Sequence, residues 1–264
     1  MNPVAALRSD IEVDPRAPSP DNGAVRREDF ENAPDLGLPS RDQILALYLR
    51  LRALGKPHHD NVWDFLSSDW IWQNARRVGL ASGRTLVFEN PDEMELAADL
   101  AIHTAPPGRS RAIERYAQRA RFAPDSPEAF MLDLMRAARF GVFSVLGRHP
   151  AAGLVVTDAF EDTDHWLVDI GMESTMPEGA WFATRYYSPG PFIMTAGFHV
   201  PVDRLKIKIA IESTPQLARK STEEAIQDRR FAEAVYRGAI ADGAMEGVQL
   251  RDPLDDEAGH DEGR

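Results

Sequence analysis

The chain has 264 residues, of which 43% are apolar, and it contains no cysteine. Without cysteine there is no disulfide, no thiolate nucleophile and no cysteine-based zinc or iron–sulfur site in this chain. The net charge of −12 argues against general binding to polyanions. No apolar run approaches the ~20 residues that span a bilayer, and no apolar h-region follows the start. We therefore expect a cytoplasmic chain without a secretory signal, and the excess of arginine over lysine indicates a bacterial origin.

Both ends of the chain are predicted to be disordered. Residues 1–38 and 247–264 are rich in Pro, Asp and Glu and show little apolar periodicity. We interpret them as solvated tails, the second of which is acidic.

Residues 39–150 are predicted to form a helical domain of about five helices. The first helix carries an apolar face and is expected to end at Gly55 and Pro57, which leaves His58 and His59 in an exposed loop. Further helices are predicted over 60–79, from an N-cap at Asn90 to residue 103, over 109–122, and over 126–147. The apolar residues of the first helix are Ile44, Leu45, Leu47, Tyr48, Leu51 and Leu54.

After residue 150 the apolar period changes to two, which predicts a small antiparallel β module over 151–213. Expected strands include "GLVVTDAF", "HWLVDIG", "AWFATRYY", "PFIMTAGFHV" and the strictly alternating "RLKIKIAIE" over 204–212. A C-terminal helix is predicted within 214–246, with Ser221 and Glu224 as a capping box. The fold class is therefore α+β.

The segment "VVTDAFEDTDHWLVDIG" contains the candidate catalytic residues Asp158, His165 and Asp169. A hairpin turning at residues 162–163 would pair Phe160 with His165. His165 and Asp169 would then lie about 13 Å apart along one strand, too far to share a metal ion. This geometry favours a surface hairpin with an acidic turn. An acidic patch facing a partner, or the site of a cryptic metal-dependent hydrolase, remains an alternative. We expect no metal and no cofactor.

Arg111, Arg115 and Arg119 repeat every four residues, so they share one helix face, with Tyr116 nearby. This arginine stripe is the candidate binding surface. It is interpreted as a solvated or intramolecular face, with protein contact or nucleic-acid binding as alternatives. The phosphate-binding, dinucleotide-binding, G-x-S-x-G and H-E-x-x-H motifs are missing from the sequence.

The order of parts, with "GLVVTD", "HWLVDIG" and "PEGAWFATR", resembles a group of uncharacterised bacterial proteins over residues 60–200. The resemblance implies a helical part followed by a small β module and implies no activity. It is carried by three short pairs of residues, Gly153 with Asp158, Trp166 with Asp169, and Gly179 with Arg185.

The leading hypothesis is a non-enzymatic protein-interaction or regulatory protein that binds another protein or itself. It is favoured by the missing catalytic motifs and by the opposed charges of its segments, about +2 for residues 41–150 and about −7 for residues 151–203. Nucleic-acid binding is the first alternative, and membrane binding is not expected.

Overall fold

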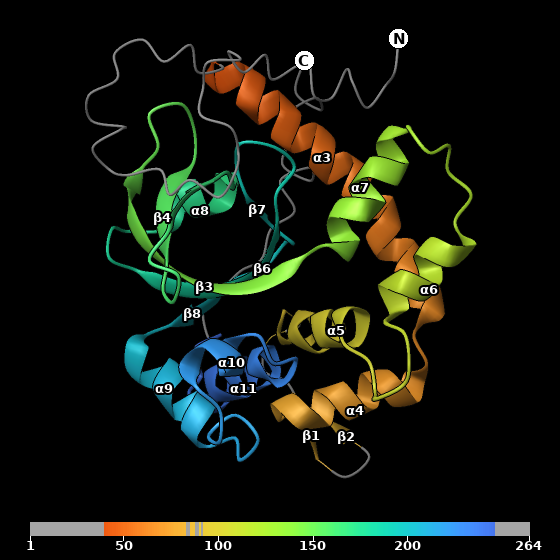
Figure 1. Ribbon diagram of the computed structural model, residues 1–264, viewed down its shortest axis with the longest axis vertical. Coiled ribbons are helices and arrows are strands. Elements are labelled where there is room, and N and C mark those ends of the chain that lie inside the picture. The colour runs from red at the N-terminus through yellow and green to blue at the C-terminus, as the bar shows by residue number, and fades with distance from the viewer. Residues whose placement is uncertain (1–39, 83–84, 88–89, 91, 246–264) are drawn as a thin grey trace.

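The computed structural model describes residues 40–82, 85–87, 90 and 92–245, which form an α+β fold (Figure 1). Helices come first, a curled antiparallel sheet follows, and further helices complete the chain. The predicted fold class is confirmed. The tails predicted for residues 1–38 and 247–264 lie outside the described residues.

The elements that precede the main sheet are mostly helices, and serine caps three of them. The side chains of Ser40, Ser67 and Ser126 each accept a backbone N–H and cap α3, α4 and α7. The helix expected from Asn90 instead begins at Glu93, with Asp92 as its N-cap. These elements are α3 (Arg41–Val62), the 3-10 helix η1 (Trp63–Phe65), α4 (Ser68–Val78), β1 (Ala81–Ser82), β2 (Thr85–Leu86), α5 (Glu93–His103), α6 (Ala112–Arg119) and α7 (Pro127–Arg136).

The first helix is longer than predicted, because α3 continues through Pro57 to Val62. Proline removes one backbone donor, but its fixed φ is compatible with a helix, and the added turn buries His58 and Val62. The prediction of an exposed loop at His58 is therefore wrong. The second predicted helix, over 60–79, is divided by η1 and by extended backbone at Leu66.

The predicted helix over 126–147 is also wrong beyond α7, because β3 (Arg139–Arg148) occupies its second half. This strand buries Val142, Phe143 and Val145, and it pairs with a neighbour on each side. Both hydrogen-bonded edges are thus satisfied, which outweighs the helical propensity of the sequence. The β part begins at residue 139, ahead of the predicted boundary at 151.

The main sheet has the strand order β5-β4-β3-β6-β7, with β8 also paired to β6. All its strand pairs are antiparallel. An isolated bridge between Leu167 and Ile193 joins the end of β5 to the start of β7, so the sheet curls into a half-barrel. The remaining strands are β4 (Leu154–Asp158), β5 (Asp164–Leu167), β6 (Trp181–Tyr187), β7 (Met194–Thr195) and β8 (Val200–Val202).

The hairpin of β4 and β5 has a different register from the predicted one. His165 pairs with Val156 instead of Phe160, so the loop covers residues 159–163. The Asp158 carboxylate accepts the backbone N–H groups of Phe160 and Glu161 and so stabilises this longer turn. Asp162 in the loop adopts a left-handed φ of 50°.

The strand predicted over 204–212 is the helix α9 (Arg204–Glu212). The Asp203 side chain accepts the backbone N–H of Lys206 at 2.8 Å and caps this helix. The closing helix is two helices, α10 (Thr222–Ile226) and α11 (Arg230–Ala241), and the capping box of Ser221 and Glu224 is present at α10. The short helix α8 (Ile170–Thr175) follows β5.

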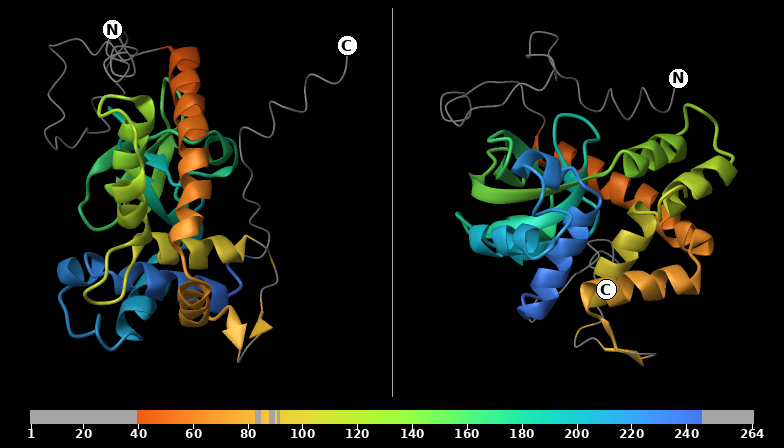
Figure 2. Two further views of the ribbon diagram at one scale, coloured as in Figure 1. Left: turned by 90° about the vertical axis from the view of Figure 1, so that its right-hand side faces the viewer. Right: turned by 60° about the horizontal axis from the view of Figure 1, so that its bottom comes forward.

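Two layers organise the molecule (Figures 1 and 2). The half-barrel lies above a layer formed by α4, α5, α9, α10 and α11, and α3 runs along one side of the sheet.

The return from β3 to β4 requires glycine at residue 153. Gly153 has a φ of 79°, and a Cβ there would lie 2.1 Å from the carbonyl oxygen of Leu167.

Candidate functional site

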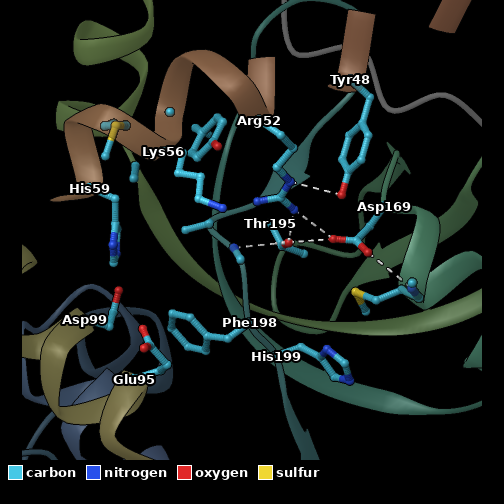
Figure 3. A pocket seen from close by; sticks show the side chains of 18 of the residues that line it. Tyr48, Arg52, Lys56, His59, Glu95, Asp99, Asp169, Thr195, Phe198 and His199 are labelled. Carbon is cyan, nitrogen blue, oxygen red and sulfur yellow. Dashed lines mark hydrogen bonds and ion pairs between the residues drawn. The ribbon is translucent and has the colours of Figure 1, made fainter. Parts of the chain in front are cut away.

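A cavity of about 940 Å³ opens between α3, α5, α8 and the end of the half-barrel (Figure 3). Its lining is partly apolar, with Met131, Met135 and Phe198 among the side chains. The volume lies in the range of pockets that bind small molecules. The polar side chains around it decide what it can bind.

The wall formed by α3 carries Tyr48, Arg52, Lys56 and His59. Their spacing of four, four and three residues places them on one helix face. Figure 3 shows Arg52 and Lys56 projecting from α3 over the cavity, on the side opposite Glu95. Asp60 of the same helix also lines the cavity, so this wall carries two cationic side chains, Arg52 and Lys56, and one acidic one.

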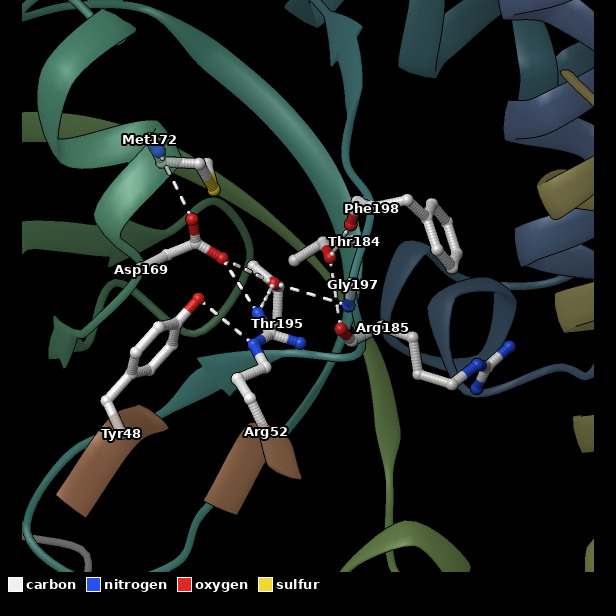
Figure 4. Close-up of polar contacts among 9 residues, drawn as sticks. All are labelled: Tyr48, Arg52, Asp169, Met172, Thr184, Arg185, Thr195, Gly197 and Phe198. Carbon is white, nitrogen blue, oxygen red and sulfur yellow. Dashed lines mark hydrogen bonds and ion pairs between the residues drawn. The ribbon is translucent and has the colours of Figure 1, made fainter. Parts of the chain in front are cut away.

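Arg52 is the centre of a nearly buried hydrogen-bond network (Figure 4). Its Nε donates to the hydroxyl of Tyr48 at 3.0 Å, and its Nη2 donates to Asp169 Oδ2 at 3.0 Å and to Thr195 Oγ1 at 2.8 Å. The Thr195 hydroxyl donates in turn to Asp169 Oδ2 at 2.7 Å. Among the described residues, none accepts a hydrogen bond from Arg52 Nη1.

The elements hold these side chains for local reasons. Asp169 is the N-cap of α8, and its Oδ1 accepts the backbone N–H of Met172 at 3.1 Å. Thr195 ends β7, beside the bridge that brings the two sheet edges together. Burial lowers the pKa of Arg52, but Tyr48, Tyr187 and Asp169 raise it by more. Arg52 is therefore charged across the physiological range.

The opposite wall comes from α5 and carries Glu95, Asp99 and His103. Asp99 is buried and accepts two hydrogen bonds from Arg185 of β6, one of them from Nη2 at 2.7 Å. The hydroxyl of Tyr236 donates to Asp99 Oδ2 at 2.9 Å. Burial raises the pKa of Asp99, but the Arg185 guanidinium outweighs it, so the pKa is lowered and the carboxylate is ionised.

His103 lies one turn beyond Asp99, with only 6% of its side chain exposed. Its Nε2 is 4.0 Å from Asp99 Oδ1, and its Nδ1 has no hydrogen-bond partner among the described residues. Burial and the neighbouring Arg185 lower its pKa to about 3. The ring is therefore neutral at pH 7. A proton on Nε2 faces Asp99, which leaves Nδ1 as a hydrogen-bond acceptor.

The structure places the three acid–base candidates in different surroundings. Asp158 caps the turn after β4. His165 lies on β5 with its ring edge-on to Phe143, centroids 5.9 Å apart. Asp169 belongs to the Arg52 network. No group of three or more His, Asp or Glu side chains that could hold a metal ion occurs in the part of the chain that the structure describes.

The arginine stripe runs along α6 from its N-cap, Arg111, and two of its three members make contacts within the molecule. Arg111 Nη2 donates to the carbonyl of Arg136 at 3.0 Å and also bonds Glu114. Arg115 donates to the carbonyls of Ser110 and Phe65. Arg119 is exposed. Tyr116 is buried, and its hydroxyl lies 2.8 Å from Nδ1 of His58.

Sequence reasoning missed Arg52, Glu95, Asp99, His103 and Thr195. One signal was present, because Asp99 stands in the apolar run "LAADLAIH" and Arg52 follows Tyr48 and Leu51 on an apolar helix face. A charged residue within an apolar face is rarely buried unless it is paired. The pattern does not identify the partner, which lies 86 residues away for Asp99 and 117 for Arg52.

Comparison with known families matches the chain to a family of unknown function (DUF7986) over residues 42–243. The chain belongs to this family. No curated protein and no solved structure matches it. In the described part of the chain, no helix is both long enough and apolar enough to cross a membrane. Membership of this family agrees with the expected resemblance to a group without a known activity, and it assigns no activity to the cavity.

The buried neutral His103 predicts a specific dependence of stability on pH. Its folded-state pKa of about 3 lies below the ordinary value of 6.5, so the unfolded chain binds the additional proton in this range. The stability that His103 contributes is full above pH 6.5 and is lost as the pH falls toward 3. Replacing His103 with Gln should reduce the slope of unfolding free energy against pH, between pH 6 and 4, by up to about 1.4 kcal/mol per pH unit.

Urea unfolding of wild type and H103Q across this pH range measures the difference in slope. Replacement of the exposed residue Gln118 on α6 by Ala is the control, and its profile of unfolding free energy against pH should be parallel to that of wild type. Parallel profiles for wild type and H103Q would show that His103 is not held neutral by the fold.

Proposed function

We propose that the cavity binds a small zwitterionic molecule, one that carries an anionic group and an amino group. The observation that carries this proposal is the distribution of charge around the cavity, with Arg52 and Lys56 on the α3 wall and the Glu95 carboxylate on the α5 wall. Guanidinium groups bind carboxylates through paired hydrogen bonds. A ligand anion at the α3 wall and a ligand ammonium at the α5 wall match this distribution.

Two groups are available for such contacts. Arg52 Nη1 has no hydrogen bond to a described residue, although the same guanidinium is anchored through Nε and Nη2. No described residue forms a hydrogen bond or an ion pair with the Glu95 carboxylate. The Arg52 network fixes the guanidinium before a ligand arrives, which reduces the entropy lost on binding.

Binding of L-amino acids to the purified chain tests this function by isothermal titration calorimetry and thermal shift. At least one zwitterion should bind saturably, and its analogues that lack either the amino or the carboxylate group should bind at least tenfold more weakly. Glu95→Gln should weaken binding of the zwitterion at least tenfold, because one charge-assisted contact worth about 1.5–3 kcal/mol is lost. Since Glu95 has no described partner, this change should leave the fold intact.

The matched control is Glu212→Gln, which removes the same charge from the exposed end of α9. It should leave the dissociation constant unchanged. Absence of saturable binding by any zwitterion, or an equal effect of both glutamate variants, would contradict the proposal.

Non-enzymatic self-association is the second candidate function, and one surface feature favours it. Leu205 and Ile209 of α9 are 65% and 52% exposed and lie one turn apart, which gives an apolar helix face of the kind found in protein interfaces. We propose that two copies of the chain meet through this face. A dimer by light scattering that becomes a monomer in Leu205→Lys/Ile209→Lys supports it, and a concentration-independent monomer contradicts it.

A further inference from the structure

A second cavity, of about 380 Å³, lies in the helical layer, away from the Arg52 network. It is bounded by the end of α4, the C-cap of α5, the segment that follows α9, and α11 with its N-cap. None of its lining residues also lines the larger cavity. Its distinctive feature is a concentration of arginine. The four arginines are Arg77, Arg229, Arg230 and Arg237.

Only one acidic side chain, Glu233, lines this cavity. Its carboxylate oxygens lie 3.9 Å from Arg77 Nη1 and 3.8 Å from Arg237 Nη1, so it is shared at long distance between two guanidinium groups. Arg230 pairs with Asp228, which Lys220 also contacts. Arg229 makes no ion pair with a carboxylate of the described residues. The four guanidinium charges therefore exceed the two carboxylates that pair with them, Glu233 and Asp228, by two.

Three of the four arginine side chains also contact neutral groups. Arg237 Nη2 donates to the hydroxyl of the buried Thr214 at 2.8 Å. Arg229 Nη1 donates to the carbonyl of Ala105 at 2.8 Å. Arg77 stacks over the ring of Trp70 at 5.0 Å. These contacts orient the guanidinium groups of Arg77, Arg229 and Arg237 and add no negative charge, and a guanidinium has five N–H donors, more than these contacts use.

We propose that this second cavity binds the phosphate group of a small phosphorylated metabolite. A phosphate dianion presents several acceptor oxygens to planar guanidinium groups and forms paired, charge-assisted hydrogen bonds with them. It also neutralises most of the excess positive charge in the lining. The volume suits a phosphate with a short carbon frame. This site is independent of the zwitterion proposed for the larger cavity, and each can be wrong without the other.

Calorimetric titration of the full chain with inorganic phosphate and with glycerol 3-phosphate, at constant ionic strength set by sodium chloride, tests the proposal. Saturable binding with one site per chain is expected. Tighter binding of the ester would identify a phosphomonoester as the ligand class. Equal affinities would assign the site to the phosphate group alone.

The decisive variant is Arg229→Gln, because this exposed side chain anchors only one carbonyl and its loss leaves the fold intact. It should weaken binding at least tenfold. Arg219→Gln removes the same charge from an exposed position outside the cavity lining and should change the dissociation constant less than twofold. No saturable binding of either probe, or equal weakening by both variants, would overturn the proposal.

Discussion

The ion pair between Arg52 and Asp169 is the interaction on which the arrangement of the cavity depends. The two side chains are only 12% and 13% exposed, so each would be costly to bury without the other. Asp169 follows the end of β5, and Thr195, which bonds both charges, ends β7. The helix α3 is thereby joined to the two edges of the sheet, at β5 and β7, that the Leu167–Ile193 bridge brings together.

A second buried pair fixes the opposite side of the cavity. Arg185 of β6 holds Asp99 of α5, and Tyr236 of α11 bonds the same carboxylate. The two networks anchor α3 and α5 to one sheet, and each leaves an unused polar group at the cavity, Arg52 Nη1 in one case and His103 Nδ1 in the other. Buried charge therefore orders the helices in both networks, and in the Arg52 network it also holds a polar group beside the cavity.

The fold class and several local features follow from the sequence. The capping box at the start of α10 is an example. The Ser221 side chain accepts the backbone N–H of Glu224, and the Glu224 side chain accepts the backbone N–H of Ser221. The prediction over 204–212 was wrong because "RLKIKIAIE" has both a strand period and a helix start at Asp203. Capping by Asp203, together with burial of Ile207 and Ala210 only, gives the helix. The predicted helix after residue 136 was wrong because pairing of β3 on both edges is a tertiary effect.

The site was less predictable than the fold. Asp169 was a candidate site residue because it lies in an acidic segment, whereas its partner Arg52 lies in a helix 117 residues earlier. Periodicity and capping describe neighbours within a few residues, and neither specifies which distant charge a buried carboxylate meets. The same holds for Asp99 and Arg185.

A double-mutant cycle of Arg52→Met and Asp169→Asn, read by the free energy of unfolding in urea, tests the central claim most directly. If the pair joins α3 to the half-barrel, the two changes should be strongly non-additive, with a coupling energy of about 2 kcal/mol or more. Additivity within about 0.5 kcal/mol would contradict the claim that this contact organises the cavity.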